Sequence, residues 1–260
     1  MREEADLGRK PLLLQLGLLA LIAALWEFAP RILGMSPLVL PPLSDALGTL
    51  GGELTGDGSL WSNTWVTIKE VAGAFAIASV VGVLIGVIVG TSPWLRKVAL
   101  PLLSAGFAVP IMVLIPLFLV TLGLGSASKV GFGALYAFFP VVFNTVVGVG
   151  SVDKTHRELG RAFGLSRAAT LRKIVARSAA RNILNGLQTA AAIAIIAVIS
   201  IEMFGSVAGL GYLIKSAGHR LRIDEVYGLI LVTLLVAIGL LSIIRLLARA
   251  VNVRLEMTAE

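Results

Sequence analysis

Long stretches without any charged residue limit the fold of this chain more than any other feature. The five longest are Val71–Leu95, Val98–Ser128, Val130–Val152, Asn182–Ile201 and Val226–Ile244. An α-helix needs about 20 apolar residues to cross the hydrocarbon core of a bilayer, and each run reaches or nearly reaches that length. A further apolar run, Pro11–Leu25, lies near the N-terminus. We therefore predict an all-α polytopic membrane protein with six transmembrane helices.

The composition agrees with this class. Of the 260 residues, 57% are hydrophobic and only 14% are charged, whereas a soluble domain has about 25% charged residues. The net charge of +7 does not require a nucleic-acid partner, because membrane proteins collect Lys and Arg in their cytoplasmic loops. The absence of cysteine excludes disulfides, thiolate metal sites and cysteine nucleophiles.

The residues divide into predicted spans and loops within one transmembrane domain, 1–260. The spans are predicted at about residues 11–31, 67–91, 98–122, 130–151, 182–203 and 226–247. Residues 32–65 and 204–225 are predicted to be external loops, the first because it is rich in proline and glycine. Pro101, Pro110 and Pro116 are expected to break the long run that contains the third span. We read the first span as uncleaved, and expect Glu27 near its end to be interfacial or packed against protein.

Positive charge predicts the orientation. With both termini in the cytoplasm, 16 of the 22 Lys and Arg residues lie in cytoplasmic segments and six lie outside. Because cytoplasmic loops carry the excess of Lys and Arg, we predict this orientation. It places residues 153–181 in the cytoplasm.

Small residues indicate how the helices pack. Ala74, Ala78, Gly82, Gly86 and Gly90 recur every four residues in the second span. Such a stripe lets another helix approach closely, so we predict a helix contact there. The fifth span is rich in alanine, which suits a crowded central position.

The segment 153–181 is strongly basic, with eight of the 22 Lys and Arg residues. Apolar residues still recur at helical spacing within it, and Gly164 separates two groups of them. Ser166 follows as an expected N-cap. We predict two short amphipathic helices joined at Gly164, with an ordinary basic loop as the alternative.

The residue inventory argues against an enzyme. His156 and His219 are the only histidines, no HExxH pair is present, and no GxxxxGK[ST] loop exists for ATP. Residues 164–168 imitate part of a nucleophile elbow but lack its final glycine. We therefore expect no catalytic residue, cofactor site or metal site in this chain.

The segment 153–181 resembles the coupling loop of bacterial ABC importer permeases, written E-A-A, three residues, G, nine residues, I-x-L-P. Glu158 stands at the acidic position, Gly164 six residues later, and nine residues separate Gly164 from Ile174. Leu159 and Gly160 replace the two alanines, and Ala176-Arg177 replaces the Leu-Pro ending.

Further stretches make the chain similar to the aliphatic sulfonate, taurine and nitrate permeases. These stretches are LPP at 40–42, VPIMVLIPLFLVTLGLGSASK at 109–129 and GLGYLIKSAG at 209–218. Two positions depart from the family: Phe107-Ala108 replaces an arginine-proline pair, and Thr121-Leu122 replaces Trp-Phe.

The resemblance implies a type I ABC importer permease in the bacterial inner membrane. A second copy of the chain, a cytoplasmic ABC ATPase dimer that holds ATP and Mg, and a periplasmic or lipid-anchored binding protein would be its partners, besides membrane lipid. The expected solute is a small organic or inorganic anion such as a sulfonate, taurine, nitrate or bicarbonate; riboflavin and pyrimidine-precursor permeases are members of the same family. The residues expected to dock the ATPase are Glu158, Leu159, Ala162, Phe163, Gly164 and Ser166.

The translocation pathway is predicted from the few polar or flexible residues of the third and fifth spans. They are Met112, Leu117, Thr121, Gln188, Ser200 and Glu202. The alternative is that most of them pack the helices. For Glu202, at the outer end of the fifth span, an interfacial or loop-anchoring role is favoured over a solute contact. The competing functions are an ion-coupled secondary transporter or channel, and a membrane scaffold or enzyme subunit. A secondary transporter is expected to carry ionisable residues near the middle of the membrane, and the predicted spans contain few.

Overall fold

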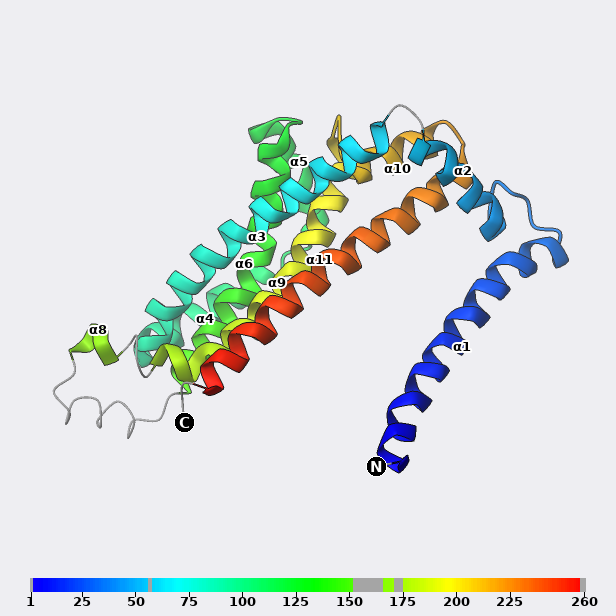
Figure 1. The fold of residues 1–260 in the computed structure, drawn as a ribbon. Helices are drawn as coiled ribbons and strands as arrows, with labels where there is room; N and C mark the ends of the chain where they lie inside the picture. The colour runs from blue at the N-terminus through cyan, green and yellow to red at the C-terminus, as the bar shows by residue number, and fades with distance from the viewer. Residues whose placement is uncertain (1, 56–57, 152–165, 171–174, 258–260) are drawn as a thin grey trace. The chain divides into compact units, whose positions relative to one another are not determined.

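The computed structural model describes residues 2–55, 58–151, 166–170 and 175–257, and every regular element within these ranges is a helix (Figure 1). Five helices contain stretches long and apolar enough to cross a membrane. A bent pair, α4 and α5, provides a sixth candidate. The all-α polytopic fold predicted from the charge-free runs is therefore confirmed.

The described residues contain ten helices. Their bounds are α1 Arg2–Ile32, α2 Leu43–Thr55, α3 Ser59–Thr91, α4 Pro93–Phe107, α5 Ile111–Leu122, α6 Ser126–Gly150, α8 Arg167–Thr170, α9 Ala176–Gly205, α10 Leu210–His219 and α11 Ile223–Met257. They form two compact units, which are described separately. The first comprises Met1–Ser62 with Leu213–Thr233, and the second comprises Asn63–Tyr212 with Leu234–Glu260.

In the first unit, α1 is joined to the start of α2 by Glu27. Its carboxylate accepts hydrogen bonds from the Ser44 amide at 2.9 Å and the Ser44 hydroxyl at 3.1 Å, and it pairs with Arg31 at 2.7 Å. The carboxylate therefore faces the N-terminal turn of α2, where free amides attract negative charge. Of the two positions expected for Glu27, the structure shows packing against protein.

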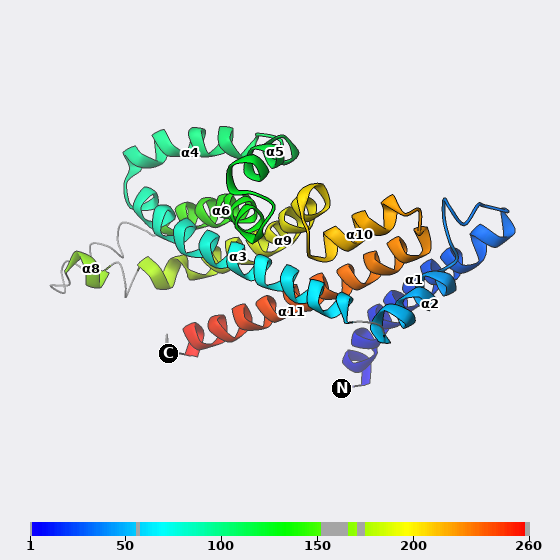
Figure 2. The same ribbon diagram turned by 90° about the horizontal axis from the view of Figure 1, so that it is seen from above.

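The core of the second unit is the contact between α6 and α9, which run side by side in both views (Figures 1 and 2). Helix α6 is buried along most of its length, and Ala190, Ala191, Ala194 and Ala197 of α9 are fully buried. A Cβ added to Gly186 of α9 would lie 2.9 Å from the Pro140 carbonyl of α6, so the two backbones are in close contact. The alanine-rich fifth span is central, as predicted.

The small-residue stripe of α3 packs against α6. A Cβ added to Gly82, Gly86 or Gly90 would lie 2.5–2.7 Å from the Cβ of Val141, Thr145 or Val149, respectively. These three partners have the same four-residue spacing as the glycines, so the two helices meet along a common line. The predicted helix contact is confirmed.

Helices α4 and α5 meet at a bend of 89°. Pro110 stands at this break, whereas Pro101 and Pro116 lie inside the two helices. The expectation that all three prolines break the run was therefore wrong for two of them. The Tyr136 hydroxyl of α6 donates to the Val109 carbonyl at 3.1 Å and holds the bend against the core.

Two segments expected to be loops contain helices. Helix α2 lies within residues 32–65 and α10 within residues 204–225. Helix α2 buries Ala46 and Leu50 and exposes Ser44, Asp45 and Leu47, so it is amphipathic. At 13 residues it is too short to span a bilayer.

Candidate functional site

Of the predicted ATPase-docking segment, residues 153–181, the structure describes 166–170 and 175–181, which comprise Ser166, α8 and the start of α9. The Ser166 hydroxyl accepts the Ala169 amide at 3.2 Å, and its carbonyl accepts the Thr170 amide at 2.9 Å. Ser166 is therefore the N-cap of α8, as its position after Gly164 predicts. The other predicted docking residues, Glu158, Leu159, Ala162, Phe163 and Gly164, lie outside the described residues.

The six predicted pathway residues do not form one site within this chain. Met112, Leu117 and Thr121 are exposed on α5, but Met112 lies about 140° around the helix from Leu117 at 100° per residue. The Thr121 hydroxyl donates to the Leu117 carbonyl at 2.7 Å, so its hydrogen is used within its own helix. On α9, Gln188 and Glu202 lie about 21 Å apart along the axis at 1.5 Å per residue. Ser200 is half-buried between them.

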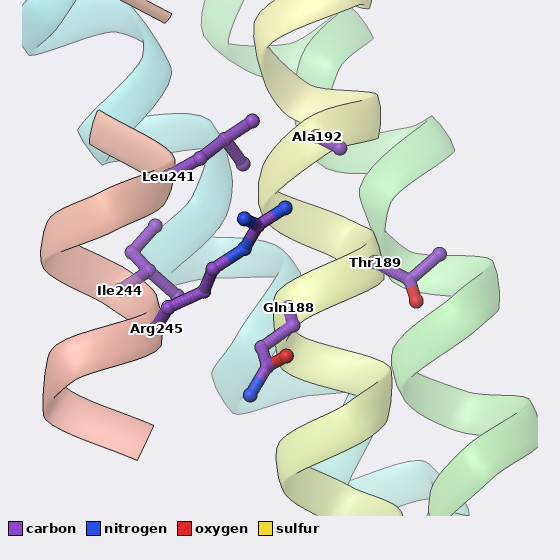
Figure 3. Close-up of a pocket in the computed structure, with 6 residues that line it drawn as sticks. All are labelled: Gln188, Thr189, Ala192, Leu241, Ile244 and Arg245. Atoms are coloured by element: carbon purple, nitrogen blue, oxygen red, sulfur yellow. The ribbon is translucent and has the colours of Figure 1, made fainter. Parts of the chain in front are cut away.

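Gln188 lines a pocket of about 330 Å³ between α9 and α11. Figure 3 shows the Arg245 side chain of α11 extending toward α9, and Gln188 lies on the part of α9 that faces it. Ala192, Leu241 and Ile244 supply apolar walls, and Thr189 lies on the far side of α9 in this view. The pocket thus combines the guanidinium of Arg245, the amide of Gln188 and the hydroxyl-bearing Thr189 with three aliphatic residues.

Glu202 lies at the opposite end of α9 and is fully buried. One carboxyl oxygen accepts the Thr67 hydroxyl of α3 at 2.8 Å, and the other accepts the Gly211 amide of α10 at 2.8 Å. The Thr67 oxygen in turn accepts the Leu210 amide at 2.8 Å. Glu202 and Thr67 together therefore cap the N-terminus of α10, where amides lack partners within the helix.

Two further buried titratable side chains complete this polar cluster. Glu70 of α3 is 3% exposed and contacts Ser126 and Glu202, while Lys129 of α6 is fully buried. The Lys129 ammonium interacts electrostatically with both carboxyl groups and donates to two carbonyls of the α5–α6 loop, Leu124 and Gly125. Charges buried in a membrane protein are expected to pair in this way. We call Thr67, Glu70, Lys129 and Glu202 the polar cluster.

The turn before α10 is shaped to fit the polar cluster. Gly209 has φ +105°, and its amide donates to the Asn63 side chain at 2.7 Å. A Cβ at Gly209 would lie 2.3 Å from the Glu202 carboxyl group, so both its backbone conformation and its surroundings require glycine. The cluster therefore joins α3, α6 and α9 to the start of α10.

From its place at the end of the fifth span, Glu202 was expected to be interfacial or to anchor a loop rather than to contact solute, although it was also included among the pathway residues. The contacts with Gly211 and Thr67 are those of a loop anchor. Glu70 and Lys129 were missed as its partners. The signal was present, because Glu70 lies inside the predicted span 67–91, where an ionised side chain needs a partner.

Comparisons with known proteins agree with this architecture. Residues 79–257 match the family described as binding-protein-dependent transport system inner membrane component. The chain is 31% identical to a protein named as an aliphatic sulfonates transport permease, SsuC, of Bacillus subtilis (strain 168), over 93% of this chain and 88% of the relative. It is 28% identical to the taurine transport system permease protein TauC of Escherichia coli (strain K12), over 86% of this chain and 83% of the relative. Its fold resembles a chain of the inward-facing MetNI methionine ABC transporter, with a TM-score of 0.62, 18% identity, and coverage of 76% of this chain and 99% of that one.

Proposed function

Because the chain belongs to the family of binding-protein-dependent transport system inner membrane components, it is a permease subunit of an ABC importer, and we propose that the importer carries a small anion. The anion would be a sulfonate, taurine, nitrate, bicarbonate or a related solute. The family match over residues 79–257 is the observation on which the importer function rests. The names of the sulfonate and taurine relatives support the solute class.

We propose that two copies of the chain form the pathway and that each rests on a separate ATPase subunit. ATP and Mg would bind in that subunit, because the sequence has no phosphate-binding loop of the GxxxxGK[ST] type. The docking element would be residues 153–181, and the Ser166 cap supports it by starting a helix two residues after Gly164. Closure of the ATPase dimer would move this element and, through the rigid α6–α9 core, the opposite end of the helices.

The proposed orientation puts both termini and residues 153–181 on the cytoplasmic side of a bacterial inner membrane. The excess of Lys and Arg in these segments supports it. The polar cluster agrees with the predicted order of spans, because it brings together the α5–α6 loop and the α9–α10 turn, which that order puts on one side. The two contacts place these segments at one end of the second unit. A periplasmic or lipid-anchored binding protein would deliver the solute at that end.

Transport by the reconstituted importer tests this function. The full-length chain, its ATPase subunit and its binding protein would be placed in liposomes, and accumulation of radiolabelled taurine, nitrate and bicarbonate measured with ATP or a non-hydrolysable analogue. We expect one of these anions to accumulate only when ATP is hydrolysed. Accumulation driven by an ion gradient without ATP would contradict the importer, and uptake of riboflavin but no anion would contradict the solute class.

A further inference from the structure

We propose that the pocket between α9 and α11 binds the headgroup of an anionic phospholipid, with Arg245 contacting the phosphate and Gln188 donating a hydrogen bond. The pocket's volume of about 330 Å³ lies within the range of small-ligand sites. Its one guanidinium and one amide are the donors that a phosphate group requires. This inference is independent of the solute that the importer carries.

The position of Arg245 along α11 is that of a residue at the membrane interface. It directly follows the charge-free run Val226–Ile244, so it lies where the hydrocarbon core ends. Lipid phosphates occupy this depth in a bilayer. The part of the chain that the structure describes shows no acidic partner for Arg245. Its positive charge is therefore free to bind an anion.

The surroundings of the pocket favour a lipid over a soluble anion. Ile243, Leu246 and Leu247, next to Arg245 on α11, are 55–63% exposed. In a membrane protein such exposed apolar side chains face acyl chains, so lipid has access to this helix. The aliphatic walls formed by Leu241 and Ile244 suit the glycerol and upper acyl region of the same molecule. Basic pockets between transmembrane helices are known to bind anionic headgroups.

Native mass spectrometry of the full-length chain, stripped of lipid in detergent, tests the proposal. The probes are palmitoyl-oleoyl phosphatidylglycerol, which is anionic, and the matching phosphatidylethanolamine, which is zwitterionic. The variant Arg245→Gln removes the charge, and Ala192→Phe fills the pocket without changing any charge. Arg249→Gln is the matched control, because Arg249 is exposed one turn further along α11 and does not line the pocket.

We expect phosphatidylglycerol to be retained in preference to phosphatidylethanolamine. A hydrogen bond to a charged group is worth about 1.5–3 kcal/mol, so Arg245→Gln should weaken binding about 10-fold or more. Ala192→Phe should weaken it as well, and Arg249→Gln should leave it unchanged. Equal retention of both lipids, or equal loss in Arg245→Gln and Arg249→Gln, would overturn the proposal. Displacement of the lipid by millimolar taurine or inorganic phosphate would also overturn it and assign the pocket to a soluble anion. If Arg245→Gln does not fold, Ala192→Phe decides alone.

Discussion

The hydroxyl of Thr67 donates a hydrogen bond to Glu202 and accepts one from the Leu210 amide, each over 2.8 Å. One small side chain of α3 thereby holds the end of α9 and the start of α10 together. Replacing Thr67 with valine keeps the shape but removes both hydrogen bonds and leaves buried groups unpaired. We expect a loss of about 1–3 kcal/mol in the free energy of unfolding per unpaired group, measured by thermal unfolding in detergent. Thr67→Ser keeps the hydroxyl and should therefore keep most of the stability that Thr67→Val loses. Equal losses in the two variants would contradict the role of the hydroxyl.

Glu202 offers a second test of the polar cluster. Glu202→Ala leaves the Gly211 amide unpaired and removes a carboxyl group that interacts with the buried Lys129. Removing one partner of a buried charged group costs about 3–5 kcal/mol, so the melting temperature should fall strongly. The control is Ser200→Ala, two residues earlier on the same helix and half-buried, which should change stability by about 0.5 kcal/mol or less. Similar melting temperatures for the two variants would show that Glu202 does not anchor α10.

The contact between α3 and α6 makes a third prediction. A Cβ at Gly86 would lie 2.5 Å from the Cβ of Thr145, so Gly86→Ala must push the two helices apart. Overpacking of this kind costs about 1–3 kcal/mol. Gly239 of α11 has no neighbour within 4 Å of an added Cβ, so Gly239→Ala should be neutral or stabilising by up to about 1 kcal/mol. Thermal unfolding of both variants would measure the difference, and a Gly86→Ala protein as stable as the parent would contradict the close contact.

The sequence was sufficient to predict features that depend on spacing within one segment. The four-residue repeat of Ala74 to Gly90 predicts a close helix contact, and Ser166 after Gly164 predicts a cap. Each of these signals is local, because a helix brings residues three or four apart to one face. The partner of the stripe, α6, was not predicted, because nothing in the repeat identifies the helix that packs on it.

Features that depend on several distant segments were harder to predict. Glu70 and Lys129 are surface-like residue types at the ends of predicted spans, and only the packing of α3, α6 and α9 buries them beside Glu202. Helix α2 was missed because prolines and glycines dominate the composition of its segment. Pro101 and Pro116 remain inside helices, because an apolar helix tolerates proline when neighbouring groups satisfy the freed carbonyl.

Gly164 tests the coupling of ATP hydrolysis to transport. Gly164→Trp adds a large side chain where the coupling-loop resemblance requires a sharp turn and close approach. We expect ATP-driven uptake by the reconstituted importer to fall at least about tenfold, because a helix-in-groove contact depends on a few buried anchors. The membrane-inserted chain should retain its melting temperature. Unchanged uptake and unchanged assembly with the ATPase would contradict a docking role for this segment.

Cross-linking to the ATPase subunit tests most directly whether residues 153–181 bind that subunit. The chain contains no cysteine, so a single introduced cysteine reports on one position. Ala162→Cys lies in the proposed docking segment, and Val207→Cys, at a residue that is 68% exposed in the α9–α10 turn, lies at the proposed external end. With a short bifunctional thiol–amine reagent in native membranes, we predict a cross-link from position 162 to the ATPase and none from position 207. A cross-link from position 207 with none from position 162 would contradict both the orientation and the docking site.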